Sequence, residues 1–238
     1  MIAGSITAGR HHAPPYTIVF ALYPGVTQLD FTGPLEFLSK LPRARCLLAS
    51  SRGGDIRADG GVVFSGIARL ADIERCDLLC VPGGLGTMEA MEDAELLGQL
   101  RRLAAGADYL SSVCTGSLLL GAAGLLKGRR AACHWAWLDS LAAFGAHPCP
   151  DRVVVDGKLF SGGGVTAGID MALTLMAEIA GPEFAQTVQL TLEYAPAPPF
   201  ASGRPELASP EVLAAARRRI DQLRDLREEA VMRAASNL

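Results

Sequence analysis

The chain has 238 residues, of which 50% are hydrophobic, and it carries a formal net charge of −3 with a sequence pI of about 5.8. This length allows one large domain or two small ones, and the hydrophobic content supports a large buried core. The acidic balance argues against nucleic-acid binding, which needs a basic surface. No apolar run approaches the roughly 20 residues that span a membrane, so no membrane association is expected.

The cysteines indicate a reducing environment. Six are scattered along the chain, and at least Cys46 and Cys80 lie inside apolar, strand-like runs. This is no compact disulfide framework, so we expect reduced thiols and a cytoplasmic protein. Cys76 and Cys80 lack the spacing of a zinc knuckle, and no second pair follows them, so no metal site is expected. Residues 1–15 lack the apolar stretch of a signal peptide and are expected to form a flexible arm.

The first half of the chain alternates between strand and helix patterns. Continuous apolar runs predict buried strands at residues 16–23, 45–51 and 77–81. An amphipathic pattern predicts a helix over 94–105, and a Gly/Asp-rich stretch at 53–61 fits a hairpin or loop. Thr32 and Pro34 are expected to open another helix after Asp30, with Thr32 as its N-cap and Pro34 in its first turn.

A sharp strand-to-helix junction follows at Cys114. Residues 109–113 have a strand pattern and residues 115–123 an apolar helix pattern. A cysteine at a helix N-terminus lies near unpaired backbone N–H groups and the positive end of the helix dipole, so its pKa is expected to be lowered. We interpret Cys114 as a nucleophile, with a buried inert thiol as the alternative.

The second half of the chain ends in helical patterns. Residues 153–156 and 158–161 flank Gly157 as a hairpin, and helices are expected over 165–179 and 183–194. Residues 210–235 are predicted to form one amphipathic helix, whose apolar stripe packs on the body of the chain or on a second copy.

The order of these elements predicts an α/β sandwich with a mainly parallel central sheet. Ligands bind such sheets beyond the carboxyl ends of the strands. Asp30, Gly83–Gly84 and Cys114 each follow a predicted strand, so we expect the fold to bring them together. The predicted domains are a flexible arm at 1–15, an α/β domain at 16–200 and a helical extension at 201–238.

Several motifs resemble the ThiJ/PfpI superfamily: Asp30-Phe-Thr-Gly-Pro34, Val81-Pro-Gly-Gly84 and Ser112-Val-Cys-Thr-Gly116. Within it, four further runs resemble the isonitrile hydratases of bacteria: Ala123-Gly-Leu-Leu126, His134-Trp135, Gly162-Gly-Gly-Val-Thr-Ala-Gly-Ile-Asp170 and Val188-Gln-Leu-Thr-Leu-Glu-Tyr-Ala-Pro-Ala-Pro-Pro-Phe200. The resemblance covers roughly residues 16–235. It implies a flavodoxin-like fold with a cysteine nucleophile elbow, and a homodimeric enzyme without a metal or organic cofactor.

The same resemblance implies addition of water to a small apolar isocyanide, R–N≡C, to give an N-substituted formamide. By position, Cys114 matches the nucleophile, Asp30 the acid–base carboxylate and Thr115 the adjacent site residue. The chemistry needs such a pair, because a thiol must add to the isocyanide carbon and an acid must deliver a proton there. The resulting thioimidate is then hydrolysed by water.

The resemblance also implies a pocket around these groups. The backbone N–H groups of Gly84, next to Gly83, and of Thr115 match an anion pocket of the superfamily. Val165 matches a β-branched residue near the cysteine-bearing helix. From the residues alone, Asp30 also suits a turn, and Gly83–Gly84 an ordinary tight turn.

Two other functions remain open. Similar domains form the ligand-sensing halves of AraC-like regulators, but about 38 residues with balanced charge follow Phe200, so a DNA-binding module is not expected. A stand-alone sensor, or a glyoxalase- or hydrolase-type cysteine enzyme, is the remaining alternative. Thr115 stands where peptidase-like relatives have histidine, which argues against a Cys–His peptidase. His134 is expected to be a structural hydrogen-bonding residue.

Overall fold

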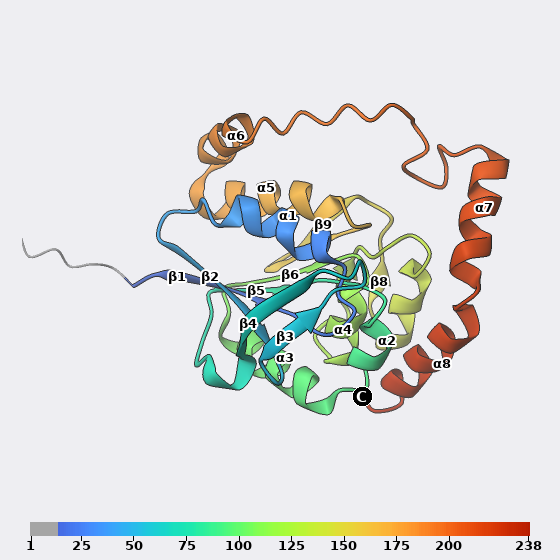
Figure 1. Cartoon of the computed structure of the whole chain (residues 1–238), viewed down its shortest axis with the longest axis horizontal. Helices are drawn as coiled ribbons and strands as arrows, with labels where there is room; N and C mark the ends of the chain where they lie inside the picture. Colours follow the sequence, from blue (N-terminus) through green and yellow to red (C-terminus); the bar gives the residue numbers. More distant parts are fainter. Residues whose placement is uncertain (1–13) are drawn as a thin grey trace, which may run out of the picture.

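A computed structural model describes residues 14–238, so the predicted flexible arm, apart from Pro14 and Pro15, lies outside the described residues. The central sheet contains β1 (Tyr16–Ala21), β2 (Ala44–Ser50), β3 (Gly54–Arg57), β4 (Val63–Arg69), β5 (Leu78–Val81), β6 (Tyr109–Val113), β9 (Val153–Asp156) and β10 (Leu159–Gly162). Its strand order is β3-β4-β2-β1-β5-β6-β10-β9 (Figure 1). The strands from β4 to β10 in this order are parallel, and β3 and β9 pair antiparallel at the two edges.

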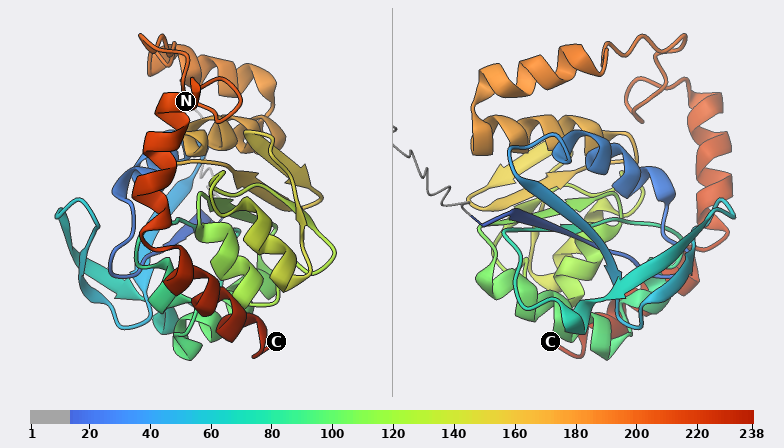
Figure 2. Two further views of the ribbon diagram at one scale, coloured as in Figure 1. Left: turned by 90° about the vertical axis from the view of Figure 1, so that its right-hand side faces the viewer. Right: turned by 60° about the vertical axis from the view of Figure 1, so that its left-hand side comes forward.

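Helices cover both faces of this sheet. They are α1 (Gln28–Leu38), α2 (Thr87–Ala90), α3 (Ala94–Gly106), α4 (Gly116–Ala122), α5 (Ala167–Ala180), α6 (Pro182–Thr191), α7 (Pro210–Asp221) and α8 (Arg224–Ala235), with 3-10 helices η1 (Leu70–Asp72) and η2 (Leu138–Phe144). Helices α1 and α5 pack together on one face, and α3 and α4 on the other (Figures 1 and 2). The predicted flavodoxin-like sandwich with a mainly parallel sheet is confirmed. A separate short pair joins β7 (Arg130–Ala131) and β8 (His147–Pro148).

The central strands are buried on both sides. Ile18, Val19 and Phe20 of β1 and Leu78 and Leu79 of β5 are at most 1% exposed. Helix layers on both faces leave no solvent side, so these strands are continuous apolar runs rather than alternating ones. The carboxyl ends of β1, β5 and β6 therefore meet at one edge of a rigid, packed sheet.

Helix α1 begins earlier than predicted. It starts at Gln28 with Thr27 as its N-cap residue, so Asp30 lies in the first turn of the helix and not in a turn before it. The predicted N-cap, Thr32, is inside the helix, and so is Pro34. Pro34 has no N–H to donate to the carbonyl four residues earlier, which normally ends a helix. Tertiary packing overrides that local signal.

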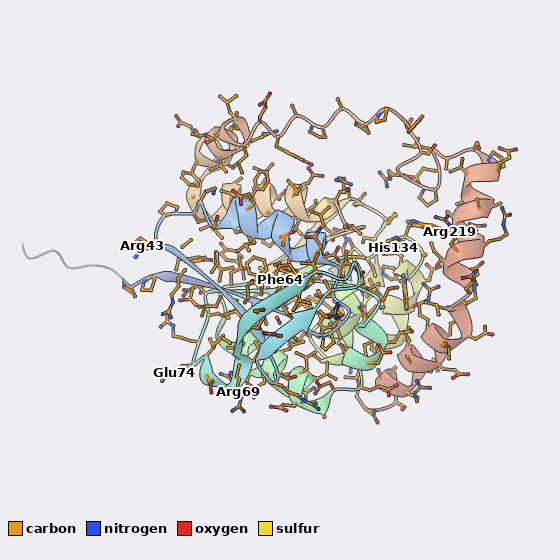
Figure 3. All side chains as sticks on the ribbon, viewed as in Figure 1. Arg43, Phe64, Arg69, Glu74, His134 and Arg219 are labelled. Atoms are coloured by element: carbon orange, nitrogen blue, oxygen red, sulfur yellow. The ribbon has the colours of Figure 1, made fainter. Side chains whose placement is uncertain are left out.

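One such contact is aromatic. Phe31, next to Asp30 in the first turn of α1, packs edge-on against Phe64 of β4 with ring centroids 4.8 Å apart. Figure 3 labels Phe64. Phe31 is fully buried. The contact fixes the turn that carries Asp30 against the β3–β4 hairpin.

The C-terminal residues 210–235 form two helices rather than the single one predicted. Helices α7 and α8 are separated by Gln222 and Leu223. Ala230, Val231 and Ala234 of α8 are buried on the body of the chain, whereas no residue of α7 is buried. The break lets α8 turn onto the body (Figure 2). Of the helices in the described part of the chain, none has the length and apolar character to cross a membrane.

Candidate active site

Cys114 lies at the carboxyl end of β6, in a sharp turn before α4. Its backbone φ is 58°, in the left-handed region that non-glycine residues rarely adopt. Its N–H donates to the Gly162 carbonyl oxygen at 3.0 Å. Gly116, the first residue of α4, lies so close to the Val81 carbonyl that a Cβ atom there would collide with it. Strands β5 and β10 thus hold the strand-to-helix junction that the sequence predicts.

Asp30 reaches the same place from α1. Its side chain is only 1% exposed, and Oδ2 accepts a hydrogen bond from the Gly83 N–H at 2.9 Å. Oδ1 is also buried and makes no hydrogen bond to any residue that the structure describes. Buried polar atoms are nearly always paired, so this unpaired carboxyl oxygen needs an explanation, and its place beside a cysteine offers one. One oxygen is fixed, and the other is available to a thiol or a substrate.

The Asp30 carboxyl and the Cys114 thiol perturb each other. Burial raises the pKa of Asp30 to about 7, although the Gly83 N–H and the Cys114 thiol oppose this shift. Burial, followed by the Asp30 charge, raises the pKa of Cys114 well above its ordinary value, and the Thr115 N–H opposes that rise. The expected lowering of the thiol pKa by the helix N-terminus is therefore wrong. Helix α4 has only seven residues, and burial outweighs its effect.

Gly83 and Gly84 form the turn after β5 that faces Cys114. A Cβ atom on Gly83 would lie 2.5 Å from the Thr115 nitrogen and Oγ1, and 3.0 Å from Asp30 Oδ2. Only glycine fits where these three segments meet. The Gly84 N–H, which the resemblance places in an anion pocket, donates to Thr115 Oγ1 at 3.0 Å. The fold thus brings together Asp30, Gly83, Gly84, Cys114 and Thr115.

Two buried hydroxyl groups behind this turn escape prediction from the sequence. Thr87 Oγ1 lies 2.8 Å from Thr115 Oγ1 and 3.0 Å from the Tyr23 hydroxyl. Tyr23 follows β1 and Thr87 begins α2, two positions where such residues are ordinary. Only the tertiary contact between these segments distinguishes them, and no local pattern signals it.

Val165 lies slightly apart, in the loop between β10 and α5. It is half-buried in the wall of a cavity of about 420 Å³ that Cys133 and His134 also line. Cys133 is close enough to Cys114 to raise the pKa of its thiol, so this cavity neighbours the nucleophile.

His134 binds the backbone two residues further along the chain. It accepts a hydrogen bond from the Ala136 N–H at 3.3 Å through Nδ1, which fits the predicted structural role (Figure 3). Burial and the nearby Arg227 charge lower its pKa. Within residues 14–238, no three His, Cys, Asp or Glu side chains are grouped to hold a metal ion.

Comparison with known proteins gives one family match and several relatives. Residues 16–178 match the DJ-1/PfpI family. Isonitrile hydratase of Pseudomonas putida is 49% identical over 221 residues, which cover 93% of this chain and 97% of that protein. The HTH-type transcriptional regulator CdhR of Pseudomonas aeruginosa is 32% identical over 178 residues, or 71% of this chain and 52% of the regulator.

A solved structure extends the likeness to the whole fold. The crystal structure of a ThiJ/PfpI family protein from Pseudomonas syringae matches with a TM-score of 0.87 and 34% identity. The match covers 98% of this chain and 97% of that one, so it includes the C-terminal helices. With the family match over residues 16–178 and a cysteine elbow at the sheet edge, this chain belongs to the DJ-1/PfpI family.

Proposed function

We propose that this chain hydrates isocyanides to N-substituted formamides, with Cys114 as the nucleophile and Asp30 as the general acid and base. The observation that carries the proposal is the buried Cys114–Asp30 pair, in which the Gly83 N–H holds Asp30 Oδ2 and the carboxyl and the thiol shift each other's pKa. The 49% identity to isonitrile hydratase over nearly the full length of both chains supports this substrate class.

The first half of the reaction joins substrate to sulfur. The Asp30 carboxylate accepts the Cys114 proton as the sulfur bonds to the terminal isocyanide carbon. Asp30 then delivers that proton to the same carbon, which gives the thioimidate Cys–S–CH=N–R and restores the carboxylate. An Asp30 pKa of about 7 suits transfer in both directions near neutral pH. The neutral resting thiol therefore needs no prior ionisation.

The second half adds water. The Asp30 carboxylate takes a proton from a water molecule as the water oxygen attacks the thioimidate carbon, and this proton passes to the nitrogen. The adduct Cys–S–CH(OH)–NH–R then loses its C–S bond, and its hydroxyl proton returns to the sulfur through Asp30. The products are R–NH–CHO and the free thiol, so the net change is addition of one water.

The substituent R needs an apolar space next to the sulfur. The cavity of about 420 Å³ lined by Cys133, Trp135, Leu138 and Val165 adjoins this position, although Cys114 itself does not line it. Its charged lining residues include Arg152 and Arg204, which are paired with Asp170 and Glu206. Asp151 also lines the cavity and has no ion-pair partner among the described residues. The apolar side chains and the two paired arginines suit an uncharged R group, so we place R on that part of the wall.

The test uses purified protein with an aryl isocyanide and follows formamide production. We expect Cys114→Ala to lower turnover by roughly 10³-fold or more, because a covalent nucleophile is lost. Cys80→Ala is the matched control, since Cys80 is also a buried thiol but lies within β5, and it should keep most of the activity. Turnover by Cys114→Ala would refute the covalent scheme.

The same assay separates the alternatives. Binding of the isocyanide without formamide production would indicate a sensor, the class that the likeness to CdhR supports. Loss of methylglyoxal without any action on isocyanides would indicate a glyoxalase-type enzyme. Either result would reject the proposed reaction.

We also propose that two copies of the chain associate. The support is the C-terminal part, where Leu190 and Phe200 are 82% and 79% exposed. Large apolar side chains exposed this far favour a protein contact over solvent. Light scattering from the purified chain should give twice the 25.0 kDa mass of one copy.

A further inference from the structure

A chain of buried hydroxyl groups lies behind the candidate site, and the proposed reaction leaves it without a role. It runs from Thr115 Oγ1 to Thr87 Oγ1 at 2.8 Å and on to the Tyr23 hydroxyl at 3.0 Å. Thr115 and Tyr23 are each 4% exposed, and Thr87 is fully buried. So little contact with water means that each hydroxyl proton needs an acceptor within the protein.

The direction of these hydrogen bonds follows from the available protons. The Gly84 N–H donates to Thr115 Oγ1 at 3.0 Å, so that oxygen acts as an acceptor. The single Thr115 hydroxyl proton then has Thr87 Oγ1 at 2.8 Å as its nearest acceptor, with the Gly84 carbonyl at 3.4 Å. Thr87 donates in turn to the Gly84 carbonyl at 2.7 Å, and Tyr23 donates to the Pro82 carbonyl at 2.9 Å. These three bonds use all three hydroxyl protons, so the 3.0 Å approach of Tyr23 to Thr87 is a contact between two oxygens that each donate to a carbonyl of the turn.

These hydrogen bonds fix the Gly83–Gly84 turn after β5 through its backbone groups. Thr115 Oγ1 accepts from the Gly84 N–H, and its own proton is directed to Thr87 Oγ1. Tyr23 and Thr87 bind the carbonyl groups on either side of Gly83. The Gly83 N–H in turn donates to Asp30 Oδ2 at 2.9 Å and leaves Oδ1 free.

We propose that Thr87 and Tyr23 are positioning residues, whose hydroxyl groups hold the Gly83–Gly84 turn so that the Gly83 N–H orients Asp30 toward Cys114. This inference rests on the proposed function for its kinetic consequences. The orientation of Asp30 by the Gly83 N–H does not depend on the substrate. The Gly83 hydrogen bond also lowers the pKa of Asp30, so loosening the turn raises that pKa further.

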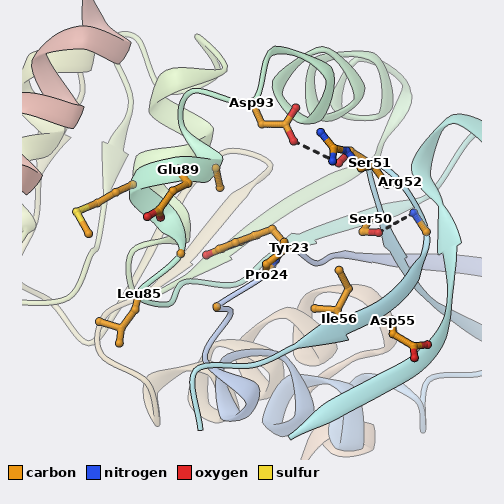
Figure 4. A pocket seen from close by; sticks show the side chains of 15 residues that line it. Tyr23, Pro24, Ser50, Ser51, Arg52, Asp55, Ile56, Leu85, Glu89 and Asp93 are labelled. Atoms are coloured by element: carbon orange, nitrogen blue, oxygen red, sulfur yellow. Dashed lines mark hydrogen bonds between the residues drawn. The ribbon is translucent and has the colours of Figure 1, made fainter. Parts of the chain in front are cut away.

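The variant at Tyr23 must keep the aromatic ring, because the ring forms part of a cavity wall. The Tyr23 side chain lies in the wall of a cavity of about 730 Å³ between the β3 hairpin and α2, which Cys114 does not line (Figure 4). Tyr23→Phe keeps the ring and removes only the hydroxyl. Thr87→Val likewise keeps the shape of the side chain and removes only the hydroxyl. Thr87→Ser keeps the hydroxyl and removes only the methyl group.

The chain supplies a matched control for the tyrosine. Tyr16 is the first residue of β1, whereas Tyr23 follows the end of that strand. The Tyr16 hydroxyl is buried and has no hydrogen-bond partner among residues 14–238. Tyr16→Phe therefore makes the same chemical change far from the turn.

Two measurements are made on each variant. The first is kcat and KM for an aryl isocyanide across pH. The second is the rate at which iodoacetamide alkylates Cys114 across pH, with the alkylated residue identified by peptide mass spectrometry. Alkylation needs no isocyanide, so it tests the positioning of Asp30 even if the protein turns over no isocyanide.

We expect Thr87→Val to lower kcat by about tenfold with little change in KM, because the Gly84 carbonyl loses its nearest donor and the Thr115 hydroxyl loses its nearest acceptor. The acid limbs of the kcat profile and of the alkylation profile should both move to higher pH, because the pKa of Asp30 rises. Tyr23→Phe should lower kcat by about threefold, since Pro82 loses one donor while Thr87 stays bound to Gly84. Thr87→Ser and Tyr16→Phe should behave like the unaltered chain.

Two results would overturn the proposal. One is an unchanged acid limb in both Thr87→Val and Tyr23→Phe. The other is a Thr87→Ser variant as impaired as Thr87→Val, which would show that packing and not the hydroxyl matters. Thermal unfolding identifies a variant that fails to fold, and if Thr87→Val does so, Tyr23→Phe against Tyr16→Phe decides the question.

Discussion

Cys80 lies in β5 and Cys114 directly follows the neighbouring strand β6, and the pair shows what distinguishes a nucleophile from a core thiol. Cys80 lies within β5 and is 4% exposed; Cys114 follows β6 and is 6% exposed. Burial raises the pKa of both thiols. Exposure and resting ionisation therefore do not separate the two.

The partners of the two thiols differ. Cys80 is held in a regular strand beside the Ser111 hydroxyl, whereas Cys114 has a left-handed backbone and faces the Asp30 carboxyl. A neutral buried thiol becomes a nucleophile when a base beside it takes the proton during attack. The base, and not a lowered thiol pKa, is what makes Cys114 reactive in this account.

Removing the base should have the largest effect. We expect Asp30→Asn to lower kcat for an aryl isocyanide by roughly 10²- to 10⁴-fold, the usual contribution of general acid–base catalysis. The amide keeps the size of the side chain and can still accept from the Gly83 N–H, so the fold should persist. Steady-state kinetics and a urea unfolding curve check the two parts. Activity within a few fold of the unaltered chain would place Cys114 in the same class as Cys80.

The stability of the fold should depend on the same carboxyl group. The pKa of Asp30 is about 7 in the folded chain against an ordinary value of 3.8, so the folded state binds this proton more tightly than the unfolded state. Its stabilising effect is full below pH 3.8 and is lost as the pH rises toward 7. The difference corresponds to at most about 4 kcal/mol.

Urea unfolding at pH 4 and pH 8 measures this effect. Compared with Asp30→Asn, the unaltered chain should lose more unfolding free energy between these two pH values, by up to about 4 kcal/mol. Equal losses in the two proteins would mean that Asp30 has an ordinary pKa in the folded state. Such a result would remove the basis for proton transfer near neutral pH.

The convergence of the site is predictable because it depends on topology. Asp30, Gly83 and Cys114 each follow an apolar run, and the carboxyl ends of parallel strands meet at one edge of a sheet. Local patterns also locate the Cys114 junction, the Gly157 hairpin and most helices.

The features that escape prediction arise from tertiary contacts. Pro34 signals a helix start, yet α1 continues through it. The helix N-terminus suggests an acidic thiol at Cys114, but burial beside Asp30 reverses the direction of the shift. Thr87 and Tyr23 have no local signal, because their hydroxyl groups meet only when α2 packs near the end of β1. A sequence pattern contains neither burial nor these distant pairs.

The most direct test of the account is the pH dependence of Cys114 alkylation by iodoacetamide in the unaltered chain and in Asp30→Asn. We predict that the rate in the unaltered chain rises through pH of about 7, as Asp30 ionises and becomes a base. In Asp30→Asn the rise should occur only well above pH 7, where the thiol itself ionises. Coincident profiles in the two proteins would contradict the claim that Asp30 activates Cys114.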